Sequence, residues 1–194
     1  MENQKTMARQ SGKFVAAEDQ TKWEVIDAAD HSVFQGYDSL QCQSRLCLLG
    51  EDQDYWHLVF RETPFYGESG GQVGDVGKVM VADREFAVAD TVKLNDRIVH
   101  LVRKAGEFPR NATQFTLEVN GRFRQATACN HTSTHLLQAA LRQVLGDHIH
   151  QSGSLVTPER LRFDFNHFEK ISADQLRQVE SLVNEVIAAD ITVC

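Results

Sequence analysis

The change in hydrophobic spacing near Arg124 is the feature that most constrains the fold. Before this residue, short runs of β-branched and aromatic residues alternate with turn formers. After it, apolar residues recur every three or four positions, which is helical spacing. A chain whose first part favours strands and whose second part favours helices is typical of an α+β protein. We therefore expect an α+β fold built from two successive parts.

The first part, residues 28–119, predicts a small β-barrel-like subdomain. Two residue pairs, Asn95-Asp96 and Asn120-Gly121, are typical of tight hairpin turns. Several short strands in one stretch favour a barrel or a strongly curved sheet. The strand-forming runs lie at 55–60, 78–82, 85–94, 97–102 and 114–119. Residues 1–27 are polar with a weakly helical run at 16–26, and we interpret them as a linker or the end of a preceding helical region.

The second part, residues 120–194, predicts a two-layer α/β core. Asn130 is a favourable N-cap for a helix that Gly146 would end. The alternation at 161–165 indicates a strand, and Ser172 with Gln175 forms a capping box before a second, amphipathic helix. The run at 191–194 looks like the opening of another strand. We therefore expect this core to be truncated at its C-terminus.

Charge and cysteine content limit the class of protein. The net charge of −7 argues against non-specific wrapping of nucleic acid but allows a local basic patch. Arg122 and Arg124 form such a patch, or alternatively a solvated strand face. The four cysteines form no C-x-x-C pair, and no secretory signal is present, so we expect reduced thiols and a cytoplasmic protein. No stretch reaches the roughly 20 apolar residues of a membrane span, so no membrane association is expected.

His131 and His135 are the candidate metal ligands. Residues four apart on a helix share one face, so both imidazoles could reach one zinc ion. The alternative is a pair of polar first-turn residues that face solvent. A zinc peptidase helix carries a glutamate directly after its first histidine, and Thr132 stands there instead. A metal at this position would therefore hold substrate or position water without a neighbouring carboxylate base.

Two polar segments are further candidates for a site. The segment at 64–77 contains five glycines in fourteen residues, without the G-K-[ST] of a phosphate-binding loop. It forms either a tight β-turn or a loop that passes close to a substrate and exposes the amide of Gln72. The run at 150–156 either lines a pocket with Gln151, Ser152 and Ser154 or is an ordinary loop.

The stretches "FYGESGGQVGD", "NHTSTHLLQAALRQVLGDHIHQSGSLV" and "RLRFDF", in this order, closely resemble the editing domain of alanyl-tRNA synthetase. Free-standing alanyl-tRNA editing proteins and the editing domain of threonyl-tRNA synthetase are more distantly similar. The resemblance covers about residues 30–194. It implies hydrolysis of the ester of seryl- or glycyl-tRNA for alanine, with zinc as cofactor and the acceptor end of alanine tRNA as partner.

The resemblance also implies a ligand set. In the family, two histidines, here His131 and His135, bind zinc together with a Cys-x-x-x-His pair much further along. That pair would lie beyond Cys194, so we expect half of a zinc site and a weak or inactive chain. The ATP- and magnesium-dependent aminoacylation site of such synthetases is expected to lie before residue 1.

Residues in the two polar segments acquire roles by the same resemblance. Gly70, Gly71 and Gln72 correspond to the family loop near the substrate's acceptor end, and Gln151 to the lining of the editing pocket. We therefore expect Gln72 and Gln151 to be catalytic. The glycines, together with Arg122 and Arg124, become candidate tRNA contacts.

Two other functions remain open. A non-catalytic module that binds tRNA or links domains would explain the missing ligands. A small zinc hydrolase of unrelated type is disfavoured, because Thr132 cannot act as its general base.

Overall fold

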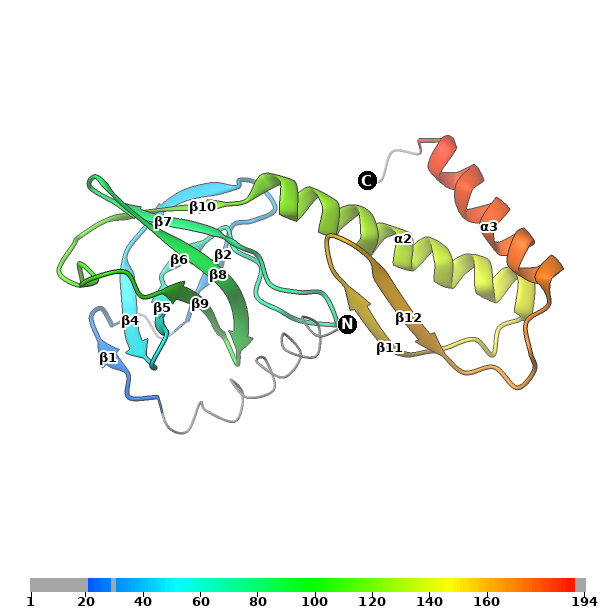
Figure 1. The fold of residues 1–194 in the computed structure, drawn as a ribbon, viewed down its shortest axis with the longest axis horizontal. Helices are drawn as coiled ribbons and strands as arrows, with labels where there is room; N and C mark the ends of the chain where they lie inside the picture. The colour runs from blue at the N-terminus through cyan, green and yellow to red at the C-terminus, as the bar shows by residue number, and fades with distance from the viewer. Residues whose placement is uncertain (1–20, 29–30, 191–194) are drawn as a thin grey trace. The chain divides into compact units, whose positions relative to one another are not determined.

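The computed structural model describes residues 21–28 and 31–190 and divides the chain into two compact units (Figure 1). The expected α+β class is confirmed: strands make up the first unit, and both described helices belong almost entirely to the second. Residues Gly70–Val73 belong to the second unit, although their neighbours on both sides belong to the first. The units comprise Met1–Ser69 with Gly74–Gly121, and Gly70–Val73 with Arg122–Cys194.

An eight-stranded antiparallel sheet forms the first unit, in the order β1-β4-β5-β9-β8-β7-β10-β3. Two further short strands, β2 and β6, form a separate parallel pair. The strands are β1 (Glu24–Val25), β2 (Val33–Phe34), β3 (Gln41–Ser44), β4 (Leu46–Glu51), β5 (Tyr55–Phe60), β6 (Glu62–Thr63), β7 (Gly77–Val81), β8 (Arg84–Leu94), β9 (Arg97–Arg103) and β10 (Phe115–Val119).

The sheet is curled into a barrel-like form, as the sequence predicts. Strands β3 and β4 are separated only by Arg45, yet β3 is at one edge of the sheet and β4 lies next to the other edge. Consecutive Cα atoms are about 3.8 Å apart, so Ser44 and Leu46 must be close in space. The two ends of the sheet can meet in this way only if the sheet wraps round on itself.

Strand β5 shows why the barrel is stable. Neighbouring side chains on a strand point to opposite faces. Leu58 and Phe60 join the main core cluster, whereas Val59 between them joins a second cluster on the opposite face. All three side chains are fully buried. Apolar side chains therefore cover both faces of this strand.

Most strand predictions agree with the structure. The run at 55–60 is β5, and the other four predicted strands coincide with β7 to β10 to within one residue at each end. The Asn95-Asp96 turn joins β8 to β9, with Leu94 opposite Arg97. The weak helical prediction at 16–26 is wrong for Glu24–Val25, which form β1, and residues 16–20 lie outside the described residues.

Helix α2 (Gly121–Leu145) begins nine residues before Asn130, so two sequence predictions are wrong. Gly121 opens a helix and not a hairpin, and Asn130 is inside the helix and does not cap it. The cause is a buried helical face that carries threonines. Thr127 and Thr134 are buried, and each hydroxyl donates to the carbonyl four residues earlier. A search for regularly spaced apolar residues does not detect a buried face that carries threonines. Gly146, with φ +114°, follows the helix as predicted.

The second unit packs its two helices and one hairpin round a small core. The hairpin consists of β11 (Gln151–Val156) and β12 (Leu161–Phe165), and the second helix is α3 (Ala173–Ala188). The predicted capping box at Ser172 and Gln175 is confirmed, as is the strand at 161–165. The core is formed by Ala140, Leu141, Ile149 and Val179, with partly buried side chains from β12 and both helices around them. The strand predicted at 191–194 lies outside the described residues.

Two other sequence expectations concern the described residues. Cys42, Cys47 and Cys129 are free thiols, and burial raises the pKa of Cys42 to about 11, so this thiol stays protonated at neutral pH. No helix between residues 21 and 190 is long and apolar enough to cross a membrane.

Candidate functional site

His131 and His135 lie on the same face of α2, one helical turn apart. Their ring centroids are 5.0 Å apart, and the rings are tilted by 41°. His131 is half-buried and His135 is exposed. The pair lies in the middle of a long helix and not at its first turn, because α2 begins at Gly121. Both residues are therefore fixed within one continuous helix, and they share a face because residues four apart in a helix are neighbours.

Gln72 orients the first of these imidazoles. Its Oε1 lies 2.5 Å from Nδ1 of His131, and the Gln72 side chain is buried. An amide oxygen only accepts hydrogen bonds, so Nδ1 carries the proton. In the neutral ring, Nε2 then has a free lone pair, which is the arrangement that suits a metal ligand.

The electrostatic environment keeps His131 neutral. Burial lowers the pKa of His131, and the neighbouring His135 lowers it further. A lowered pKa means that the ring remains unprotonated to a lower pH than an ordinary histidine. The imidazole is therefore in its ligand-competent form at neutral pH.

The segment Gly70–Val73 carries Gln72 and pairs with β11. The amide of Val156 donates to the carbonyl of Gly71 (2.8 Å), and the amide of Val73 donates to the carbonyl of Val156 (3.1 Å). At Gly71, where φ is +85°, an added Cβ would lie 2.5 Å from the carbonyl oxygen of Ser154. Only glycine can therefore occupy this position, and its closeness to β11 places the Gln72 side chain beside α2.

Gln151 is tied to the same segment through Ser154. Its Nε2 donates to Oγ of Ser154 (3.0 Å), and this hydroxyl donates to the carbonyl of Gly70 (3.3 Å). Gln151 and Ser154 are both on β11, so the interpretation of 150–156 as an ordinary loop is wrong. Gly70, with φ +60°, has open space where a Cβ would be. The structure thus brings together Gly70, Gly71, Gln72 and Gln151, although Gln151 reaches the segment only through Ser154.

Arg122 and Arg124 do not form a joint patch. Two residues apart on a strand they would share a face, but in the first turn of α2 they point in different directions. Arg122 is exposed and Arg124 is half-buried. Their role as tRNA contacts stays a prediction, and the interpretation as a solvated strand face is wrong.

Two residues of this unit were not recognised from the sequence in their structural roles. The Nδ2 of Asn130 donates to the carbonyls of Thr157 (2.8 Å) and Pro158 (3.3 Å), which ties α2 to the end of β11. Ser154 links Gln151 to the glycine segment. Neither contact could be found from local spacing, because the partners lie 27, 28 and 84 residues apart.

The donor set fits half of a zinc site. Zinc binds neutral imidazole nitrogen, and a structural or catalytic site uses at least three protein ligands. Among the described residues, no group of three or more His, Cys, Asp or Glu side chains gathers in a metal-binding arrangement. A zinc ion bound by His131 and His135 would need further ligands, and Gln72 would be an outer-shell partner of His131.

The family is decided by comparison with known proteins. A family model described as tRNA synthetases class II (A) matches residues 1–123, which is more than half of the chain. The chain belongs to the class II tRNA synthetase family. The resemblance to alanyl-tRNA synthetase noted in the sequence is confirmed at the level of this family.

Several curated relatives of this class II synthetase chain are alanine–tRNA ligases. The protein of Chlorobaculum tepidum is 44% identical over 208 residues, which cover 99% of this chain and 24% of the relative. The protein of Oleidesulfovibrio alaskensis is 47% identical over 172 residues, which cover 82% of this chain and 19% of the relative. The protein of Fusobacterium nucleatum is 40% identical over 196 residues, which cover 100% of this chain and 23% of the relative. The chain spans about a quarter of the length of these relatives.

Proposed function

We propose that this class II synthetase chain carries the editing region of an alanine–tRNA ligase, which hydrolyses the ester of seryl- or glycyl-tRNA for alanine. The observation that carries the proposal is the hydrogen bond between His131 and Gln72 beside the neighbouring His135. The names of the relatives support the substrate class.

His131 and His135 would hold the zinc ion, with other ligands supplied from outside the described residues. When bound, zinc supplies electrophilic polarisation of an ester carbonyl or of a water molecule. Gln72 keeps the Nδ1 proton of His131 in place, so that Nε2 presents its lone pair. An aminoacyl ester is already activated, so positioning and electrostatic help suffice without a carboxylate base in the place of Thr132.

Gln151, with Ser154, would select the misacylated substrate. A synthetic site that accepts alanine cannot strongly reject serine, which only adds a hydroxyl, so a second hydrolytic site is required. The amide of Gln151 and the hydroxyl of Ser154 are polar groups at exposed or half-buried positions of β11. They would hydrogen-bond the serine hydroxyl and give alanine no comparable contact.

The acceptor end of alanine tRNA would be the partner of this region. Gly70 leaves the backbone open to close approach, since nothing lies within 4 Å of the position of its absent Cβ. Gly71 shapes the same segment, and Arg122 and Arg124 would contact the phosphate backbone separately. Aminoacylation with ATP and magnesium would belong to other parts of the longer protein.

Deacylation of seryl-tRNA for alanine tests the proposal. We expect a longer segment that contains this chain together with further metal ligands to release serine faster than this chain alone. His131→Ala should abolish the release, and the exposed His150→Ala serves as a matched control outside the pair. Full activity of the His131→Ala variant would contradict the proposal.

A non-catalytic module that binds tRNA or links domains is the second candidate. It is favoured by the absence, among the described residues, of any group of three or more side chains that could hold a metal ion. This function predicts tRNA binding without ester hydrolysis, even in the longer segment and with added zinc. The same deacylation assay, run beside a tRNA-binding assay, therefore separates the two candidates.

A further inference from the structure

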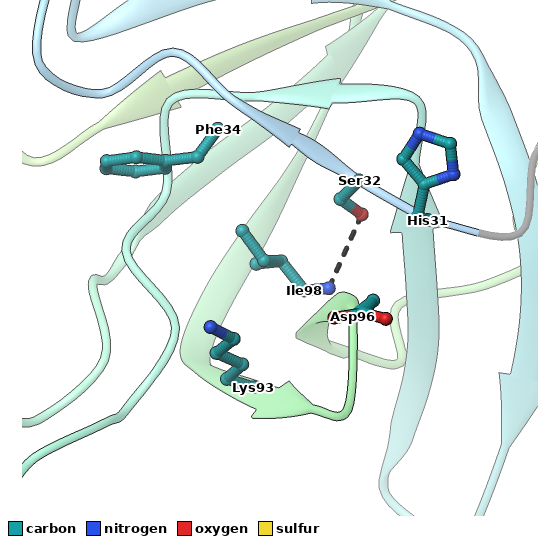
Figure 2. Close-up of a pocket in the computed structure, with 6 residues that line it drawn as sticks. All are labelled: His31, Ser32, Phe34, Lys93, Asp96 and Ile98. Carbon is teal, nitrogen blue, oxygen red and sulfur yellow. Dashed lines mark hydrogen bonds between the residues drawn. The ribbon is translucent and has the colours of Figure 1, made fainter.

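The first unit has a surface pocket of about 460 Å³ that plays no part in the proposed function (Figure 2). It lies between the β2 segment and the β8–β9 hairpin, both parts of the barrel unit. Its volume is within the range of small-ligand pockets. The pocket is lined by His31, Ser32, Phe34, Lys93, Asp96 and Ile98.

Hydrogen bonds build the wall of this pocket. The hydroxyl of Ser32 donates to the carbonyl of Phe60 (2.9 Å) and accepts from the amide of Ile98 (3.4 Å), the contact drawn in Figure 2. The amide of Ser32 donates to the carbonyl of Asp96 (3.3 Å). The serine is thus occupied in joining the β2 segment to the hairpin, and the buried Ile98 provides an apolar surface beside it.

Lys93 and Asp96 are the two charged groups of the pocket. Both residues are exposed. In the view of Figure 2, Ile98 lies between Phe34 and Lys93, and Asp96 lies on the same side of Ile98 as His31. The pocket is therefore lined by one cation, one carboxylate, one aromatic ring and one imidazole.

An aromatic row extends from the pocket. The ring of Phe34 meets Tyr37 edge to face, with centroids 5.1 Å apart, and Tyr66 at 6.2 Å. Tyr37 is 90% exposed and does not line the pocket. Phe34 and Tyr66 are half-buried, so Tyr37 is the exposed ring of this row. Aromatic rings at a protein surface are stacking surfaces for the bases of a single strand.

We propose that this pocket binds a ribonucleotide unit of single-stranded RNA. The phosphate contacts Lys93, and the base stacks on Phe34 with the neighbouring base on Tyr37. Asp96 accepts a hydrogen bond from a ribose hydroxyl, which is a common role of carboxylates in nucleotide sites. One cation with aromatic rings also agrees with the net charge of −7, since it needs no broad basic surface. Tyr37, outside the pocket, favours a strand over a free nucleotide.

Fluorescence anisotropy of a labelled six-nucleotide adenylate RNA, measured with this chain at several salt concentrations, tests the proposal. Lys93→Ala should make the slope of log affinity against log salt shallower by about 0.7, the value for one phosphate contact on a single strand. Tyr37→Ala should weaken binding by about fivefold or more. Phe34→Leu keeps an apolar side chain but removes the ring, and should weaken binding similarly. Lys22→Ala is the matched control, since Lys22 is exposed on the same unit outside the pocket.

Two comparisons identify the ligand. The RNA should bind more tightly than free AMP, and Asp96→Ala should reduce the preference for RNA over DNA of the same sequence. Competition by AMP at an affinity equal to that of the RNA would overturn the assignment to an RNA strand. An unchanged salt slope for Lys93→Ala with unchanged binding by Tyr37→Ala would overturn the pocket itself. Plain RNA carries no ester, so this outcome is independent of the deacylation test, and His131→Ala should bind the RNA normally.

Discussion

Nδ1 of His131 donates a hydrogen bond to Oε1 of Gln72, a residue 59 positions earlier in the chain. The contact joins the glycine segment to the helix that carries both candidate zinc ligands. Gln72 is buried, and its backbone forms a bridge with Val156 of β11, which fixes the position of the residue. The tautomer of His131 is therefore set by a residue on another segment, and this relationship can be tested directly.

Replacing Gln72 with methionine should weaken zinc binding. Methionine keeps the length of the side chain but removes the acceptor for the Nδ1 proton, and loss of such outer-shell partners costs about 10- to 100-fold in metal affinity. Competition with a chromophoric chelator measures the change. Gln143→Met, at an exposed position of α2, is the control. Equal zinc affinity for the Gln72→Met variant and the unaltered chain would show that the contact does not support a metal ligand.

Alanine at Gly71 should be far more damaging than alanine at Gly70. Both positions have positive φ, but only at Gly71 does the added Cβ meet the backbone of Ser154, at 2.5 Å. We expect Gly70→Ala to cost about 1 kcal/mol and Gly71→Ala roughly 2–5 kcal/mol in free energy of unfolding. Urea denaturation of the two variants measures the difference. Equal losses would mean that the glycine segment does not need its close approach to β11.

The buried His100 should make the protein less stable in mild acid. Burial lowers the pKa of His100 to about 4, while its ring bonds the carbonyl of Leu58 (3.0 Å) and the hydroxyl of Thr63 (2.8 Å). The unfolded chain protonates this histidine near pH 6.5, and the folded chain does so only near pH 4. The free energy of unfolding should therefore fall by roughly 3 kcal/mol from pH 6.5 to pH 4. Urea denaturation of His100→Gln should show a smaller fall in the free energy of unfolding between pH 6.5 and pH 4. The same pH dependence in this variant and the unaltered chain would refute the role of His100.

Asp90 has the opposite effect on stability. Burial raises the pKa of its carboxyl to about 6. The hydrogen bond from the Thr91 amide lowers this pKa, and the nearby Glu68 carboxylate raises it. Above pH 6 the fold must hold an ionised buried carboxylate, and this cost disappears as the group is protonated at lower pH. Asp90→Asn should therefore increase the free energy of unfolding by about 2 kcal/mol at pH 7.5 and have little effect at pH 4. Thermal melts at pH 7.5 and pH 4 measure the change in stability, with the exposed Asp83→Asn as control. An equal gain in stability at both pH values would contradict the prediction.

Local sequence determined the elements whose signals lie within a few residues. The β-branched runs place β5 and β7 to β10, the Asn95-Asp96 pair closes a hairpin, and Ser172 caps α3. These features depend on backbone preference and on side chains that are neighbours in the chain. Helical spacing likewise places His131 and His135 on one face.

Tertiary structure decided the features that depend on distant partners. Helix α2 starts at Gly121 because a polar-looking face with Thr127 is buried, and burial is a property of packing and not of local pattern. The need for glycine at position 71 comes from the backbone of Ser154, and the tautomer of His131 from Gln72. Such contacts join residues that only the completed fold brings together. The sequence therefore identified the candidate ligands by itself, whereas the partner that orients one of them could be read only from the structure.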